Sequence, residues 1–421
     1  MITRSKNRQV QKWPASAVHG DAAGSVIEEH AEWPQVTVVA RGVHPPWNEG
    51  TRVIARNIAL ALESASCSTS TISLSESLYA QYEGQGSKPI EHIPSRISYG
   101  VTPDYVYLRK IARAVNKATG NCGPAAIHLV GAPLALSPLI SKPNRKIIAH
   151  ITLSQQVYLS VAERLRARVG WRVFDHWVDA YACTSQQIYD DLLRQGYDRQ
   201  KLHVISPPID VQRFKPIPKA EARAMAGLDP DAFIVAYIGT VSPRRFPTAD
   251  IVAALRAMAP TVPNLLLEIF APVATHKRNK EWADDNVRQE AEGANFPVNV
   301  HLQDLTESEK ALIYSAVDVV LLPFTAAVAV EPPLTLLEAM ACGAAVVVAP
   351  HANRSNVVTD GFDGLLFGSV EELTVRLTNL YEIGQEGRAL LGKEARATVL
   401  QQYTFAKSAE AIKNLWSSIG M

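Results

Sequence analysis

The stretch Glu331-Pro-Pro-Leu-Thr-Leu-Leu-Glu338-Ala-Met-Ala-Cys-Gly343, followed at once by the apolar run Ala344–Ala349, decides the fold of this chain. Two prolines open a short helix, a glycine ends it, and a buried strand follows. Core packing does not explain acidic residues at both edges of so apolar a helix. A carboxylate there accepts hydrogen bonds from the hydroxyls of a ribose or a sugar, and the helix N-terminus offers N–H groups to an anion. The stretch therefore predicts a nucleotide-sugar site on an α/β element.

Working outward from this stretch, strand patterns alternate with helical patterns, which predicts a parallel α/β architecture. The length of 421 residues favours two Rossmann-like domains that face each other across a cleft. The proline-rich segment Pro207–Pro218 is the expected linker between them. The expected divisions are a flexible tail at 1–34, a first domain for the acceptor at 35–213, a second domain for the donor at 214–400, and a final helix at 401–421 that packs back on the first domain.

The expected strands and helices fix where each motif lies. The strands of the first domain are predicted at Val36–Ala40, Ser70–Leu74, Ala126–Val130, Lys146–Ile151, Ala180–Cys183 and His203–Ser206. The strands of the second domain are predicted at Phe233–Ile238, Leu265–Phe270, Val298–Leu302, Val319–Leu322 and Ala344–Ala349. The helices are predicted at Arg52–Ser64, Asp104–Thr119 and Leu159–Trp177 and through the tail Glu371–Ser418. Ligands of such sheets bind at the carboxyl ends of the strands, so we expect the site in the interdomain cleft.

Composition excludes several classes of partner and site. The chain has 42 lysines and arginines against 41 aspartates and glutamates, so its charge gives no argument for a nucleic-acid partner. The four cysteines show no metal-ligand spacing, which favours a site without metal in a protein of the reducing cytoplasm.

No apolar run reaches the roughly 18 residues of a membrane span. The segment Glu163–Trp177 mixes aromatic residues with arginines, so peripheral contact with an anionic membrane is an alternative to a half-exposed helix with its charges in water. The arginines of this segment are Arg164, Arg166, Arg168 and Arg172.

Two loops after strands carry residues suited to phosphate. Arg244 and Arg245 follow the first strand of the second domain and Gly239, where two guanidinium groups can clamp a diphosphate and stabilise charge on a departing nucleotide. A solvated basic loop is the alternative. In the first domain, Gly50 lets the backbone approach a ligand and Thr51 can cap the following helix, although a plain β-to-α loop explains the same residues equally well.

Two histidines lie in apolar strands of the first domain. His128 is within one strand and His150 is near the end of the next. A histidine in such a place is more often a satisfied core residue than a catalyst, so a catalytic role for either needs support from elsewhere.

Together these residues resemble glycosyltransferase family 4, whose members are retaining enzymes of the two-domain GT-B fold. The resemblance runs from about Val36 to Trp416 and rests on four segments. They are Glu338-Ala-Met-Ala-Cys-Gly-Ala-Ala-Val-Val, Asp360-Gly-Phe-Asp-Gly-Leu-Leu-Phe, the linker Val204–Pro216, and the strand and helix Val300–Pro323 that would flank the nucleotide base.

The resemblance assigns roles to individual residues. Glu338 would bind the ribose hydroxyls of the donor, Arg245 takes the place of a diphosphate-binding lysine, and Gly50 would lie near the phosphates or the acceptor. The remaining donor contacts are expected at Arg244, Gly239, Pro333, Leu334, Thr335 and Leu302. The catalytic group is expected among Arg245, Glu331, His128 and His150.

The chain departs from the family pattern at several of these positions. Val330 occupies the place of the first family glutamate, so that Glu331 is one residue late, and Pro332-Pro333 replaces a Gly-Phe-Gly loop. Further departures are Thr240 where an arginine is frequent, Thr152 where a histidine is frequent, and Asn356 where a glutamate is common. Either the loop is re-formed so that Glu331 still reaches the sugar, or that contact is lost.

The resemblance implies a metal-independent hexosyltransferase that needs no cofactor. It would move a sugar from a UDP- or GDP-linked donor to a hydroxyl acceptor, which can be a glycan, a lipid or a small molecule. Two alternatives remain: a sugar-nucleotide epimerase or phosphorylase on the same fold, and a degenerate transferase that binds a nucleotide-sugar without turnover. The missing glutamate and histidine motivate the second alternative.

Overall fold

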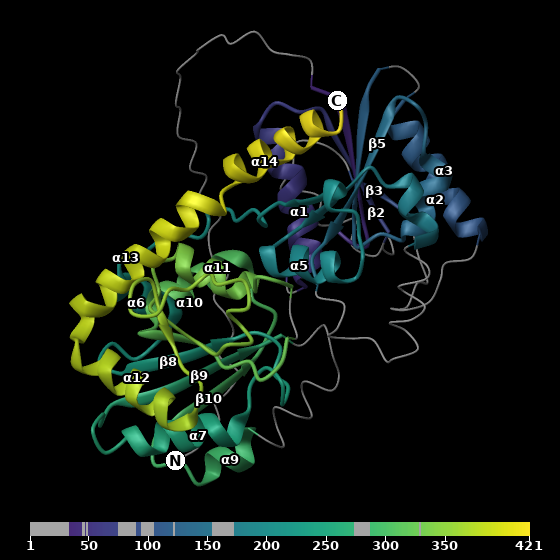
Figure 1. Cartoon of the computed structure of the whole chain (residues 1–421). Helices are drawn as coiled ribbons and strands as arrows, with labels where there is room; N and C mark the ends of the chain where they lie inside the picture. The colour runs from purple at the N-terminus through teal and green to yellow at the C-terminus, as the bar shows by residue number, and fades with distance from the viewer. Residues whose placement is uncertain are drawn as a thin grey trace.

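The computed structural model describes residues 33–43, 47, 49–74, 90–93, 105–120, 123–153, 172–272, 287–327 and 330–421. The chain forms two lobes, each built on a parallel sheet with helices on both faces (Figure 1). The parallel α/β architecture predicted from the alternation of strand and helix patterns is confirmed.

The first sheet has seven strands in the order β3-β2-β1-β4-β5-β6-β7. They are β1 (Gln35–Ala40), β2 (Thr69–Ser73), β3 (Ile90–His92), β4 (Ala125–Val130), β5 (Arg145–Ile151), β6 (Ala180–Cys183) and β7 (Leu202–Val204). All six residues of the central strand β4 are buried, as expected for a parallel strand covered on both faces. Helices α1 (Gly50–Ser64) and α14 (Phe405–Ser418) cover one face, and α2 (Tyr105–Ala118) and α3 (Ser137–Ile140) cover the other.

The second sheet has six strands in the order β10-β9-β8-β11-β12-β13. They are β8 (Phe233–Ile238), β9 (Leu265–Ala271), β10 (Val298–Leu302), β11 (Val319–Leu322), β12 (Val346–Val348) and β13 (Leu365–Leu366). Its helices form two layers (Figure 1), in which α10 packs on α6 and α12 packs on α7. The helices are α6 (Lys219–Ala226), α7 (Thr248–Met258), α9 (Arg288–Glu292), α10 (Glu307–Ala316), α11 (Leu334–Ala341) and α12 (Val370–Glu382).

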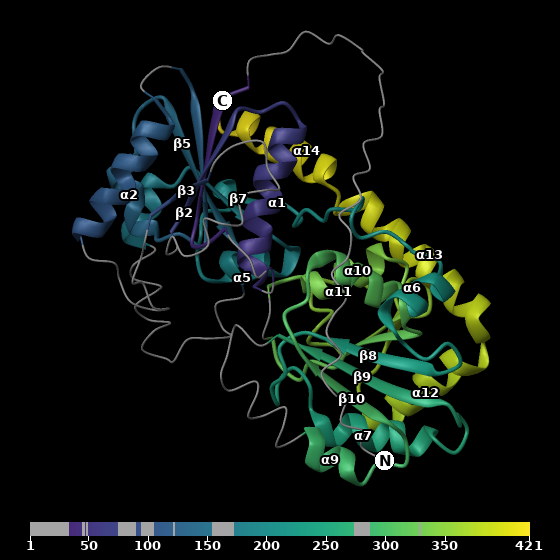
Figure 2. The same cartoon turned by 180° about the vertical axis from the view of Figure 1, so that it is seen from behind.

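The chain crosses between the lobes twice. It leaves the first lobe after β7 and returns along α13 (Gly384–Gln402) and α14, which run from one lobe to the other in both views (Figures 1 and 2). The two crossings touch where the Ile209 N–H donates to the Tyr403 carbonyl at 2.7 Å. Helix α14 then packs along α1, so the last helix lies on the first lobe.

Most predicted strands agree with the observed ones to within one or two residues. The structure adds the short strands β3 and β13, which lie at the two sheet edges and span only three and two residues. The tail at 1–32 and most of the predicted helix Leu159–Trp177, with Arg164, Arg166 and Arg168, lie outside the described residues. Among the helices of the described part, none combines the length and the apolar character needed to cross a membrane.

Candidate functional site

The second sheet has its topological switch point between β8 and β11. These strands are neighbours, but β8 continues to β9 on one side and β11 to β12 on the other, and ligands of such sheets bind at the carboxyl ends of the strands at this point. The loop after β8 carries Arg244 and Arg245, and the loop after β11 leads into α11. The loops meet where the Thr325 N–H donates to the Arg244 carbonyl at 2.9 Å. The fold thus brings the predicted phosphate loop and the opening stretch of the sequence together.

The loop after β8 turns on Gly239. Its φ of 150° suits glycine, and a Cβ there would lie 3.2 Å from the Tyr237 hydroxyl, which donates to the Thr240 carbonyl at 2.8 Å. Arg244 is exposed, whereas Arg245 is half-buried with its guanidinium 6.0 Å from the Phe324 ring centroid. The loop after β8 therefore carries two guanidinium groups at the switch point, and such groups can bind a diphosphate.

Helix α11 carries the second carboxylate of the opening stretch. It begins at Leu334, immediately after Pro333, and Thr335 in its first turn is half-buried. Glu338 is only 3% exposed, and the Tyr314 hydroxyl donates to its Oε2 at 3.1 Å. Burial raises the pKa of Glu338, and the ammonium of Lys310, 4.0 Å from Oε2, opposes that rise. Residues of α10 therefore hold this carboxylate in place.

Glu331 does not occupy an open sugar site. Its N–H donates to the Thr152 carbonyl at 3.0 Å, and the Thr184 hydroxyl donates to its carbonyl at 2.6 Å, so its backbone is docked on the ends of β5 and β6. Its carboxylate accepts a hydrogen bond from Ser355, and burial raises its pKa. In the structure Glu331 joins the two lobes, and its predicted catalytic role stays a prediction.

Gly50 lies at a close contact between the two lobes. It is the first residue of α1, and a Cβ there would lie 2.6 and 2.8 Å from the two methyl carbons of Val330. The space left by the missing side chain admits Val330 of the second lobe, and a place for Gly50 near the phosphates or the acceptor stays a prediction. The predicted cap by Thr51 is wrong, because Glu49 is the N-cap residue and the Thr51 hydroxyl lies 3.3 Å from that of Thr152.

The two histidines form a buried pair. The Trp416 indole donates to His128 Nε2 at 3.1 Å, which leaves the proton on Nδ1 to be donated to His150 Nε2, 2.7 Å away. His128 is 0% exposed, and burial lowers the pKa of both imidazoles, that of His150 to about 3. Both imidazoles are buried and His128 is held by Trp416 of α14, an arrangement that fits the structural alternative, while the catalytic roles of His128 and His150 stay predictions.

A charge cluster between the lobes was not anticipated. Arg56 of α1 forms a bidentate pair with Glu307 of α10, with distances of 2.8 and 2.5 Å, and Arg213 binds the same carboxylate. The Arg56 guanidinium stacks on Trp47 at 4.3 Å from the ring centroid, and Lys310 donates to the Trp47 carbonyl at 2.8 Å. The sequence indicates this cluster only through Arg56, an arginine among the apolar residues of α1. An arginine on a helix is easily interpreted as a solvent-exposed residue.

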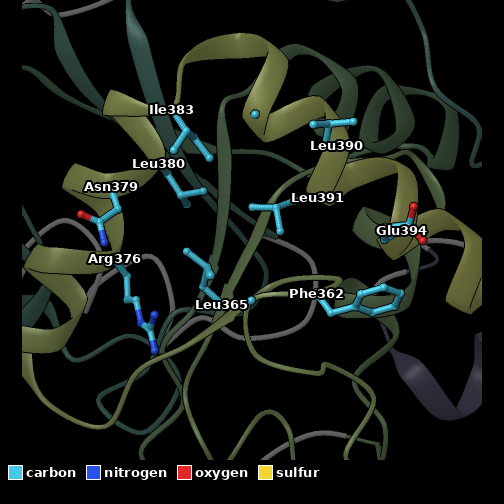
Figure 3. A pocket seen from close by; sticks show the side chains of 11 residues that line it. Phe362, Leu365, Arg376, Asn379, Leu380, Ile383, Leu390, Leu391 and Glu394 are labelled. Atoms are coloured by element: carbon cyan, nitrogen blue, oxygen red, sulfur yellow. The ribbon is translucent and has the colours of Figure 1, made fainter.

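The last predicted contact, Leu302, ends the edge strand β10 and is half-buried, two strands away from the switch point. A separate hollow of about 410 Å³ lies where α12, α13 and the turn before β13 meet (Figure 3). Its floor is apolar and its rim holds Arg376, Asn379 and Glu394, while Phe362 at its edge is 55% exposed. It shares no residue with the loops of the switch point.

Comparison with known proteins places this geometry in a family. Residues 31–213 match the family model described as Glycosyltransferase Family 4, and residues 244–414 match one described as Glycosyl transferase-like. A D-inositol 3-phosphate glycosyltransferase of Stackebrandtia nassauensis is 31% identical over 45% of this chain and 42% of that relative. The same enzyme of Segniliparus rotundus is 30% identical over 44% and 40%. The aligned segments thus span less than half the length of these relatives.

Solved structures agree on the fold. Anabaena HepE, solved with UDP and glucose, superposes with a TM-score of 0.71 at 16% identity and covers 92% of this chain and 100% of its own. Sucrose-phosphate synthase of Thermosynechococcus elongatus gives a TM-score of 0.70 at 18% identity, with 91% and 99% covered. The chain belongs to the family 4, group 1 glycosyltransferases and has the GT-B fold.

Proposed function

We propose that this protein transfers a hexose-type sugar from a nucleoside diphosphate donor to a hydroxyl acceptor with retention of anomeric configuration. The observation that carries the proposal is the β8–β11 switch point: the loop after β8 carries two arginines, and the loop after β11, which it contacts, leads into α11 with its buried carboxylate. Relatives named as D-inositol 3-phosphate glycosyltransferases and the complex of Anabaena HepE with UDP-glucose support a nucleotide-sugar donor. The HepE complexes favour uridine over guanosine as its nucleoside.

Each group at the switch point has a chemical task in this proposal. Arg244 and Arg245 bind the diphosphate and stabilise the charge that develops on it as the sugar leaves. The N–H groups at Leu334 and Thr335 add the positive end of the α11 dipole. Glu338 accepts hydrogen bonds from the ribose hydroxyls, as a charged acceptor suited to a diol.

The transfer itself needs no nucleophile from the protein. The bond between the sugar C1 and the phosphate oxygen breaks, a bond from C1 to the acceptor oxygen forms on the same face, and the acceptor proton passes to the departing diphosphate. This scheme fits the structure, in which the Glu331 carboxylate is engaged by Ser355 and both His128 and His150 are buried. Closure of the lobes excludes water and aligns the acceptor.

A binding protein without turnover is the second candidate, because Val330 rests against Gly50 and Glu331 is docked on β5 and β6. A thermal-shift panel of UDP-, GDP- and ADP-sugars, followed by product analysis, tests the proposal. We expect stabilisation by at least one donor, loss of that shift in Glu338→Ala, and sugar transfer or hydrolysis from the same donor. Binding without any product identifies the second candidate, and no shift with any donor contradicts both.

A further inference from the structure

Three side chains on one face of α10 form a row that runs from the first lobe to α11. Glu307, Lys310 and Tyr314 follow one another at helical spacings of three and four residues, so they point the same way. Glu307 binds Arg56 of the first lobe, and Tyr314 binds Glu338 of α11. Lys310 lies between these two contacts.

Lys310 is bonded to both lobes through one ammonium group. Its Nζ donates to the Trp47 carbonyl at 2.8 Å and lies 4.0 Å from Glu338 Oε2, and its side chain is 13% exposed. Trp47 belongs to the loop between β1 and α1, and its indole is stacked on Arg56. The ammonium therefore joins a loop of the first lobe to the carboxylate on the helix of the switch point.

The charge of Lys310 acts on Glu338 more than that of any other neighbour. Burial favours the neutral acid, Glu307 adds like charge, and Lys310 is the first influence that opposes burial and lowers the pKa of Glu338. A carboxylate accepts hydrogen bonds from a diol more strongly than a neutral acid does. Losing the ammonium would therefore weaken a ribose contact even if the fold stayed intact.

We propose that Lys310 is a positioning residue for the donor nucleotide. It holds the Glu338 carboxylate ready for the ribose hydroxyls and ties the Trp47 loop beside that carboxylate, so one ammonium group serves both nucleotide binding and the contact between the lobes. The inference rests on the proposed function, because it takes Glu338 as the ribose contact.

The test is calorimetric binding of UDP, or of GDP or ADP where UDP does not bind, between pH 5 and pH 8. In Lys310→Met we expect the Kd at pH 7 to rise about tenfold, as for loss of one charge-assisted interaction. Lys310→Gln can still donate to the Trp47 carbonyl but has no charge, so its loss of binding at low pH should begin at a higher pH than in the wild type. Lys310→Arg keeps the charge and should keep the wild-type pH dependence. Lys393→Met, at an exposed lysine of α13, is the matched control.

The outcomes separate the inference from the proposed function. Unchanged affinity and pH dependence in both Lys310→Met and Lys310→Gln overturn the inference alone. Weaker binding with an unmoved pH dependence and no rescue by Lys310→Arg overturns it too, because a merely structural role gives that pattern. If Lys310→Met does not fold, the affinity of Lys310→Gln for the nucleotide and its pH dependence test the inference. A wild-type protein that binds none of the three nucleotides overturns the proposed function and the inference with it.

Discussion

The buried ion pair between Arg56 and Glu307 gives the sharpest prediction about how the two lobes are held together. The substitution Arg56→Leu puts an apolar side chain in place of the guanidinium between α1 and α10. It removes two hydrogen bonds, of 2.8 and 2.5 Å, to the Glu307 carboxylate. Glu307 is 4% exposed and would keep only Arg213 of its two guanidinium partners.

The size of the effect follows from burial. Removing one partner of a buried pair costs about 3–5 kcal/mol, and the remaining contact to Arg213 puts the expected loss near 3 kcal/mol. Lys407→Met is the control, because Lys407 forms an exposed pair with Glu410 at 3.3 Å on α14. Breaking a pair of that kind should change the free energy of unfolding by less than about 1 kcal/mol.

The assay is scanning calorimetry of four proteins: wild type, Arg56→Leu, Glu307→Gln and the double variant. Because the neutral amide leaves no buried charge, Arg56→Leu should destabilise the Glu307→Gln background clearly less than the wild type. A loss below about 1 kcal/mol in Arg56→Leu, or equal losses in the two backgrounds, refutes the reasoning that this pair is a buried link between the lobes.

Three further outcomes are expected. Because burial lowers the pKa of His128 and His150, the folded protein binds fewer protons than the unfolded chain below pH 6.5. The free energy of unfolding is therefore highest above that pH and falls below it by about 1.4 kcal/mol per pH unit for each imidazole. Denaturant titrations from pH 7.5 to pH 5 measure this fall, which should be shallower in His150→Asn. Gly50→Ala should destabilise the contact between the lobes by about 1–3 kcal/mol through overpacking against Val330, and Val330→Ala should restore the loss in the same thermal melt; no rescue would contradict the contact. Trp416→Phe should cost about 1–3 kcal/mol, since it leaves His128 Nε2 buried without its donor, and an unchanged melting temperature would count against that hydrogen bond.

The architecture was predictable because most central strands, such as β4, β8 and β11, are short apolar runs. β6, β8 and β11 have the predicted bounds and are buried on both faces, and the half-buried edge strand β10 also has the predicted bounds. β3 and β13 escaped prediction because a pairing of two or three residues at a sheet edge leaves little periodicity to detect. Their position depends on the neighbouring strand rather than on their own sequence.

For the candidate site, only positions set by a residue's own strand end or helix were predictable. The positions of Glu338, Arg244 and Arg245 at the switch point follow from strand order, while their roles stay predictions. The register of Glu331 could not, since its contacts to Thr152 and Thr184 come from the other lobe. Contacts between residues far apart in sequence have no local signal, and the pairs from Arg56 to Glu307 and from Lys310 to Trp47 were missed for that reason.

If the switch point of the second lobe binds a nucleotide-sugar and activates it for transfer, the protein releases the sugar from its donor. Nuclear magnetic resonance of UDP-, GDP- and ADP-sugars incubated with the protein, with water as the default acceptor, follows both release of the sugar and the anomer first formed. We expect release from at least one donor with its anomeric configuration retained, abolished by Glu338→Ala and by Arg245→Ala and unaffected by Lys393→Met. Tight nucleotide binding with no sugar released from any donor, or activity that survives both substitutions, would contradict the account.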